Sequence, residues 1–133
     1  MLVDLYDLAI EILKARQVWE RILSSEPSLQ KAELKELLQN VLDPEKHLVP
    51  AIEEQIQGWF YDVLFLTGVG EVFPYIRSHT VLNNLQSKVK EIPTVMFFPG
   101  DYLHSDDKGA SLELFGRLHD ANYYRAFNIY EVQ

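Results

Sequence analysis

Hydrophobic and polar positions along the 133-residue chain follow two different periods. In residues 1–60, apolar side chains recur every three or four positions, which is the period of an amphipathic helix. In residues 61–133, short apolar runs and alternating stretches are separated by Gly, Pro and Asp, as is typical of strands. The pattern predicts a mainly helical first part and a second part that contains most of the strands.

The first part is expected to form three helices. One begins near Asp7, and its apolar stripe consists of Leu8, Ile12, Ala15, Trp19, Ile22 and Leu23. Residues 1–6 are either a short strand or the lead into this helix. A second helix has Ser28 as its predicted N-cap and ends at Asp43-Pro44. A third begins near Pro50 and ends at Gly58.

Residues 61–100 are predicted to form a strand–helix–strand unit. The apolar run 63–66 is closed by Thr-Gly-Val-Gly at 67–70, which suits a strand buried on both faces of a parallel sheet. Residues 72–90 have helical spacing, with Pro74 near the start, and residues 93–98 form the second strand. One right-handed crossover accounts for all three segments. The expected fold class is α/β, with a small, mainly parallel, Rossmann-like sheet flanked by helices.

The remainder of the chain is expected to add two strands to this single domain, which covers residues 1–133. Residues 101–110 are predicted to be a polar loop and residues 111–116 an exposed or edge strand. Residues 117–122 are predicted to be a turn, and residues 123–130 a final strand of high β propensity. A doubly wound sheet normally opens on its own first strand, so either the sheet is small or an N-terminal segment of a larger domain precedes Met1.

Composition narrows the possible functions. The chain has no cysteine, which excludes disulfides and thiolate metal sites. It lacks an apolar run of about 20 residues and the basic start of a signal peptide, so a cytoplasmic location is expected. The net charge is −8 and no basic stripe is present, so direct binding to nucleic acid is not expected.

Gly68 and Gly70 are the first candidates for a binding site. They lie between a strand and a helix, where main-chain N–H groups are able to hold a phosphate. The dinucleotide motif requires a third glycine where Phe73 stands, and the P-loop requires Gly-Lys where Phe73-Pro74 stand. A tight strand-to-helix turn is therefore the favoured interpretation, with nucleotide binding as the alternative.

Two polar clusters are candidate interaction surfaces. Arg77, Thr80 and Asn84 share a side of the predicted 72–90 helix, with His79 near Arg77, and this side is either a binding surface or a solvated face. Tyr123, Tyr124 and Arg125 are residue types that dominate interface hot spots, although one tyrosine in the core and one at the sheet edge is an equal alternative.

The sequence contains no complete metal-binding or catalytic serine motif. Metal-ligand residue types gather at Asp101, His104, Asp106 and Asp107, but their spacing matches no specific site, so no metal is expected. No serine lies in a Gly-x-Ser-x-Gly turn, and no catalytic residue is assigned.

Several blocks in the same order resemble one family, component B (BrxB) of the BREX bacteriophage-exclusion systems. The blocks are VDLYDLAIEIL at 3–13, FLTGVGEVFPYIRSHTVLNNLQ at 65–86, TVMFFPGDY at 94–102, LELFGRL at 112–118 and DANYYRAFNIY at 120–130. The resemblance covers essentially the whole chain. It also implies a longer N-terminus in the family, with a further strand and helix before the position of Met1.

The resemblance implies a role in defence against phage, without catalytic residues to transfer. BREX loci also encode a DNA methyltransferase, a PglZ-type protein and large ATPases. The leading hypothesis is a non-enzymatic adaptor that needs no cofactor and binds the PglZ-type protein, or else the methyltransferase. One alternative is a nucleotide- or metal-dependent regulatory or hydrolytic subunit that uses the Gly68–Gly70 turn. Another is self-association along an exposed sheet edge.

Overall fold

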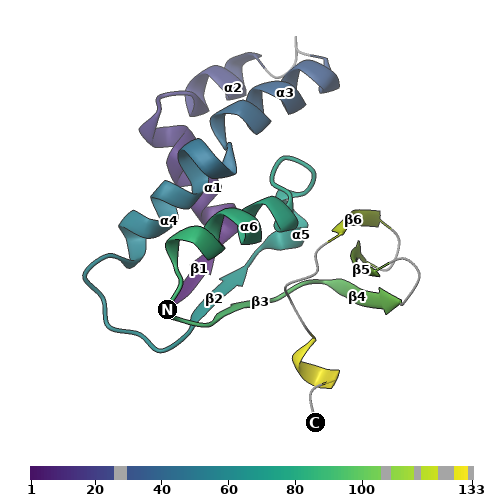
Figure 1. Ribbon diagram of the computed structural model, residues 1–133. Coiled ribbons are helices and arrows are strands. Elements are labelled where there is room, and N and C mark those ends of the chain that lie inside the picture. Colours follow the sequence, from purple (N-terminus) through teal and green to yellow (C-terminus); the bar gives the residue numbers. More distant parts are fainter. Residues whose placement is uncertain (26–29, 106–108, 116–117, 123–127, 132–133) are drawn as a thin grey trace.

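The computed structural model describes residues 1–25, 30–105, 109–115, 118–122 and 128–131 (Figure 1). The elements of the first half are β1 (Leu2–Asp4), α1 (Leu5–Ala15), α2 (Trp19–Ser25), α3 (Lys31–Val41), a π-helical turn η2 (Pro44–Leu48) and α4 (Val49–Ile56). The elements of the second half are β2 (Leu64–Thr67), α5 (Val69–Val72), α6 (Ser78–Lys88), β3 (Thr94–Met96), β4 (Gly100–Ser105), β5 (Gly109–Leu114), β6 (Leu118–Asn122) and a 3₁₀ turn η3 (Ile129–Glu131).

The first three strands form a parallel sheet in the order β1-β2-β3. Phe65 in the central strand pairs with Leu2 on one side and with Val95 on the other. The predicted strand–helix–strand unit is thus present as β2, α6 and β3, and the α/β class with a small parallel sheet is confirmed. The N-terminal residues resolve the sequence alternative, because they form both a strand and the start of α1.

Helices cover one face of this sheet. Val3, Leu64 and Leu66 are fully buried, and they share a hydrophobic core with buried residues of α1, α4 and α6. In Figure 1, the helices gather above the sheet, where α4 contacts both α1 and α6. The core side chains are Leu5, Leu8, Ala9, Ile12, Leu13, Ile22, Val41, Leu42, Leu48, Val49, Ile52, Ile56, Val69, Val72, Ile76, Val81 and Leu85 in addition to those three.

The opposite face of the sheet is not buried in the described structure. Side chains alternate between faces along a strand, so Phe65 points away from Leu64 and Leu66. Phe65 is only half-buried, and its neighbour Leu2 retains 60% of its exposure. The expectation that residues 63–66 are buried on both faces was therefore wrong.

Two breaks divide the helices differently from the prediction. The stripe from Leu8 to Leu23 belongs to two helices, because Gln17 adopts a left-handed conformation with φ of 60° between α1 and α2. The third helical segment starts at Pro44, six residues before the predicted start at Pro50. Asp43 caps this segment by accepting a hydrogen bond from the Lys46 N–H at 2.9 Å.

The start of α3 was predicted at Ser28, which lies outside the described residues. The helix as described begins at Lys31, and Gln30 at its N-cap makes no side-chain hydrogen bond to it.

The predicted 72–90 helix is also divided. The four-residue α5 ends at Val72, and Phe73 is extended, with φ of −70° and ψ of 139°. Pro74 follows, so it interrupts the helical pattern instead of starting the helix, and α6 begins only at Ser78. Ile76 belongs to the core although it lies outside both helices.

The C-terminal third forms a second sheet, antiparallel and ordered β4-β5-β6. Residues 101–105, 109–110 and 118–122 are strands, so the predicted loop and turn were wrong there. Of the strand predicted at 111–116, residues 111–114 belong to β5. Most of the final predicted strand lies outside the described residues, and its last part is the 3₁₀ turn η3. Figure 1 shows β3 leading directly into β4. None of the described helices is long and apolar enough to cross a membrane.

Candidate interaction surface

The uncovered face of the parallel sheet carries a row of apolar side chains. Strand alternation places Leu2, Phe65, Val95 and Phe97 on this side, and we call these four residues the open face. Leu2 is 60% exposed and Phe97 is 55% exposed, while Phe65 and Val95 are half-buried. The Phe65 and Phe97 rings stack, with centroids 5.7 Å apart and planes inclined by 25°. The open face is therefore an ordered apolar patch that water contacts.

A groove of about 1410 Å³ runs past β3, beside this face. Leu82, Gln86 and Val89 line it from α6 and the residue that follows α6. Asn128, Ile129 and Tyr130 line it from the region of η3, and Thr94–Met96, which are β3 itself, line it together with Phe97. The lining is mostly apolar, and its charged members are Glu71 and Lys90. Such a groove suits an apolar segment better than a charged ligand.

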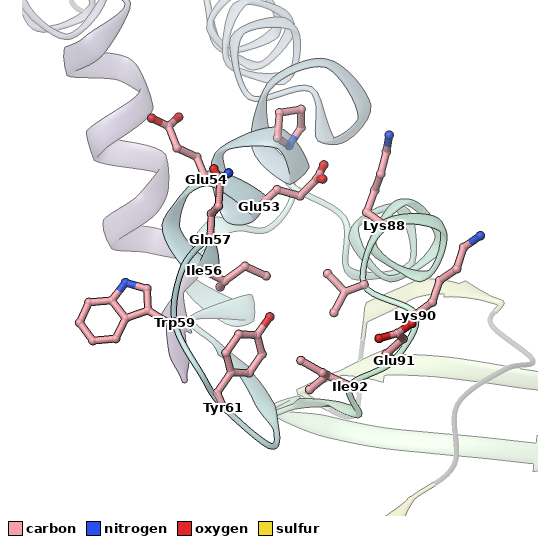
Figure 2. Close-up of a pocket in the computed structure, with 12 residues that line it drawn as sticks. Glu53, Glu54, Ile56, Gln57, Trp59, Tyr61, Lys88, Lys90, Glu91 and Ile92 are labelled. Atoms are coloured by element: carbon pink, nitrogen blue, oxygen red, sulfur yellow. The ribbon is translucent and has the colours of Figure 1, made fainter.

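A second hollow, of about 850 Å³, lies between the C-terminal ends of α4 and α6 (Figure 2). In Figure 2, the Tyr61 hydroxyl points into the hollow, towards the side chains of Ile56 and Ile92. Glu53 and Glu54 stand on the α4 side, and Lys88 and Lys90 extend from the α6 side. Glu91 lies beside Lys90, so an apolar floor is bordered by charges of both signs, which suits the side chain of a protein partner.

Two further aromatic residues lie beside that hollow, in the loop after α4. Gly58, with φ of +82°, turns the chain away from the helix. Trp59 is 69% exposed, and Phe60 is fully exposed. Trp59 is part of the lining of the hollow, but its ring points away from it in Figure 2, whereas Tyr61 is half-buried. We call Trp59 and Phe60 the aromatic loop.

Gly68 and Gly70 are both closely packed by the chain itself. Gly68 has φ of +83°, and a Cβ at this position would come within 3.1 Å of Asp4 Oδ1 and of the Tyr6 nitrogen. A Cβ on Gly70 would lie 2.8 Å from Phe115 Cζ and 3.2 Å from Pro99 Cγ. The helix that follows Gly68 has four residues. These contacts give both glycines a packing role and favour the interpretation of the segment as a tight turn.

The polar cluster at the start of α6 is engaged in local contacts. Arg77 lies over the Phe73 ring, with 5.1 Å between the guanidinium carbon and the ring centroid. The Asn84 amide donates to the Thr80 carbonyl at 2.7 Å, and the Thr80 hydroxyl is 3.2 Å from His79 Nε2. Arg77 and Asn84 are half-buried. Thr80 thus contacts both His79 and Asn84, while Arg77 contacts Phe73, and the role of these residues in binding stays a prediction.

The remaining candidates lie partly outside the described residues. Tyr123, Tyr124 and Arg125 fall there entirely, as do Asp106 and Asp107. Asp101 and His104 both belong to β4. Within the described ranges, no group of three or more His, Asp or Glu side chains is arranged to hold a metal ion.

Sequence reasoning missed the open face and the aromatic loop. Phe97 belongs to the predicted strand 93–98, where every neighbour is apolar, so the sequence does not indicate that its side chain is exposed. Trp59 and Phe60 carried a usable signal, since Gly58 ends the helix and the next strand begins only at Leu64. Two large aromatic residues in a short connection are unusual unless they contact something.

Comparison with known proteins gives one consistent result. The family model described as "BREX protein BrxB" matches residues 1–129. The chain is 40% identical over 129 residues to the BREX protein BrxB of Bacillus cereus (strain H3081.97), covering 95% of this chain and 64% of that protein. It is 29% identical over 126 residues to the BREX protein BrxB of Escherichia coli O9:H4 (strain HS), covering 95% of this chain and 60% of that protein.

The chain therefore spans somewhat under two thirds of the length of these curated relatives. No solved structure matches it. The expected resemblance is confirmed along nearly its whole length, and the chain belongs to the BrxB family.

Proposed function

We propose that this chain is a non-catalytic adaptor of a BREX phage-defence assembly. It acts in the cytoplasm and binds another BREX protein, foremost the PglZ-type protein and secondly the methyltransferase. One observation carries the proposal. The parallel sheet exposes an ordered apolar row, Leu2, Phe65, Val95 and Phe97, on the face that the described helices leave uncovered.

Leaving this apolar row in contact with water has a free-energy cost, which a bound partner would remove. Each Å² of apolar surface removed from water contributes about 25 cal/mol, and a well-packed aromatic anchor contributes disproportionately to binding. The stack of Phe65 on Phe97 fixes both rings before any partner arrives. A preordered anchor loses less conformational entropy on binding, which favours a specific protein partner.

Charge supports the same class of partner. The chain carries a net charge of −8, which opposes approach to nucleic acid and favours a partner surface that carries positive charge. At the open face itself, the four side chains are uncharged. The contact would therefore have an uncharged, apolar centre, as the core of a protein interface usually has.

The test is co-purification of the tagged chain with each protein of its BREX locus, followed by calorimetric titration of any that binds. A Phe97→Glu variant is expected to weaken binding about tenfold or more, because it places a charge in the desolvated centre. Leu23→Glu is the matched control, since Leu23 is 50% exposed on α2, away from the sheet. If no BREX protein binds, the adaptor function fails; if a BREX protein binds both variants equally well, the open face is not the contact surface.

The alternative function is a nucleotide- or metal-dependent subunit that uses the Gly68–Gly70 turn. Its support is the position of that turn between β2 and a helix. Against it stands the close approach of Asp4 and Phe115 to the two glycines. A thermal-shift assay with ATP, GTP and Mg²⁺ separates the two functions, because a bound ligand stabilises the native state and raises the melting temperature.

A further inference from the structure

The outer edge of β3 presents main-chain groups that the sheet does not use. In the parallel register with β2, the Leu64 N–H donates to the Pro93 carbonyl, and the Phe97 N–H donates to the Leu66 carbonyl, each at 2.9 Å. Bonding directions alternate along a strand, so Val95 also faces β2. The N–H and C=O groups of Thr94 and Met96 therefore point away from the sheet.

Among the described residues, none is hydrogen-bonded to these main-chain groups of Thr94 or Met96. Unpaired groups along a sheet edge form a template for another strand. Proteins usually protect such an edge with proline, lysine or a covering segment. β3 has Pro93 immediately before it, but its three strand residues, Thr94, Val95 and Met96, are without charge.

The space beside this edge has the form of a channel for an extended chain. The groove of about 1410 Å³ includes all of β3 in its lining. Leu82 and Val89 border it on the helical side, and Ile129 and Tyr130 border it near η3. A strand laid along β3 would direct alternate side chains towards these two borders.

We propose that the outer edge of β3 receives an extended segment of a partner protein, which becomes the fourth strand of the parallel sheet. The segment is bound by main-chain hydrogen bonds at Thr94 and Met96, and it carries apolar residues at alternate positions. This inference rests on the proposed function, since it identifies how the BREX partner is held. It also extends the apolar contact from the edge onto the adjacent open face through Val95 and Phe97.

Charge identifies the segment further and disfavours a second copy of the chain. Two copies would bring together two molecules of charge −8, and they would pair strands of only three residues. A segment with lysine or arginine beside its apolar positions instead gains favourable long-range attraction. Main-chain pairing supplies the affinity, and pockets for alternate side chains supply the specificity, as in strand-addition complexes generally.

The direct test is amide exchange by nuclear magnetic resonance on ¹⁵N-labelled chain, alone and with the PglZ-type protein of the same locus. The Thr94 and Met96 amides are expected to exchange quickly alone and to slow by about tenfold or more in the complex. The Val95 and Phe97 amides are the internal controls, because they already face β2.

Substitution supplies an independent measurement. Met96→Pro removes an outward N–H and places a ring where the added strand would lie, while the bonds to β2 at Val95 and Phe97 remain. Met96→Ala removes the side chain but keeps the N–H, so it separates packing from edge pairing. Only Met96→Pro is expected to weaken partner binding about tenfold or more.

The outcomes separate this inference from the function on which it rests. Slowed exchange at Thr94 and Met96, with loss of binding in Met96→Pro alone, supports strand addition. A partner that binds while both amides still exchange quickly overturns strand addition and leaves the adaptor function standing. If the chain sediments as a dimer and the Met96→Pro variant sediments as a monomer, the choice of partner is overturned. If no BREX protein binds, the adaptor function fails as well.

Discussion

The aromatic rings of Phe65 and Phe97 stack on the open face of the parallel sheet, with centroids 5.7 Å apart. The two residues belong to β2 and to the position just after β3, and they are diagonal neighbours in the register. Stacked rings on a strand pair usually lie beneath a second layer, yet Phe97 retains 55% of its exposure. The two rings are therefore packed against each other, but the described structure does not bury them.

The two faces of the sheet are expected to respond differently to truncation. Leu66→Ala removes a fully buried side chain and should lower the free energy of unfolding by about 2–5 kcal/mol. Leu2→Ala, at a position that is 60% exposed, should change it by about 0.5 kcal/mol or less. Urea denaturation of both variants measures the difference. Similar losses in the two would mean that both faces are covered.

Substitution by alanine is expected to destabilise the protein more at Gly68 than at Gly70. Gly68→Ala forces a side chain into φ of +83° against the start of α1, so a loss of about 1–3 kcal/mol is expected. Gly70→Ala meets the outer end of the Phe115 ring, which is 57% exposed and free to shift. Its effect should stay within about 1 kcal/mol, because alanine also favours the helix. Thermal denaturation compares them, and the reverse order would contradict the assigned contacts.

Gln17 is expected to be a site where glycine stabilises the protein. Its φ of 60° costs a side-chain-bearing residue about 1 kcal/mol or more, and glycine avoids that cost. Gln17→Gly should therefore raise the free energy of unfolding by up to about 1 kcal/mol. Arg16→Gly is the control, since Arg16 has φ of −88° and gains nothing from glycine. A stabilised control would show that the effect is not conformational.

Asp4 and Asp43 are expected to contribute as helix caps. Asp4 accepts a hydrogen bond from the Asp7 N–H, and Asp43 accepts one from the Lys46 N–H, both at 2.9 Å. Alanine at either position should lower the free energy of unfolding by about 0.5–2 kcal/mol. Asparagine should keep most of the stabilisation that the aspartate cap provides. Asp62→Ala removes an exposed carboxylate with no cap assigned to it. A loss in Asp62→Ala as large as those at the caps would point to overall charge as the cause.

The local signals in the sequence predicted the central elements well. A short apolar run closed by glycine identified β2, and Gly58 identified the end of the third helical segment. Asp43-Pro44 was misinterpreted, because the same pair that ends one helix also serves as N-cap and first residue of the next. Gln17 gave no warning of a break, since neither glycine nor proline marks it.

Features that depend on distant partners were not predictable. β4 and β6 have polar residues that read as loop and turn, and each becomes a strand by pairing with β5. Phe65 and Leu66 are equally apolar, so composition cannot tell which of them meets a helix. The predicted interaction residues Arg77 and Asn84 were chosen for polarity, whereas the open face depends on which side of the sheet is covered.

The open face also affects how copies of this chain behave at high concentration. Exposed apolar surface on a folded protein promotes association between copies. In this chain the net charge of −8 opposes that association, because the copies repel one another. Added salt shortens the range of that repulsion to about 10 Å at 0.1 M. Association between copies should therefore increase at salt concentrations that leave the folded state unchanged. A bound partner that covers the open face should abolish this dependence on salt.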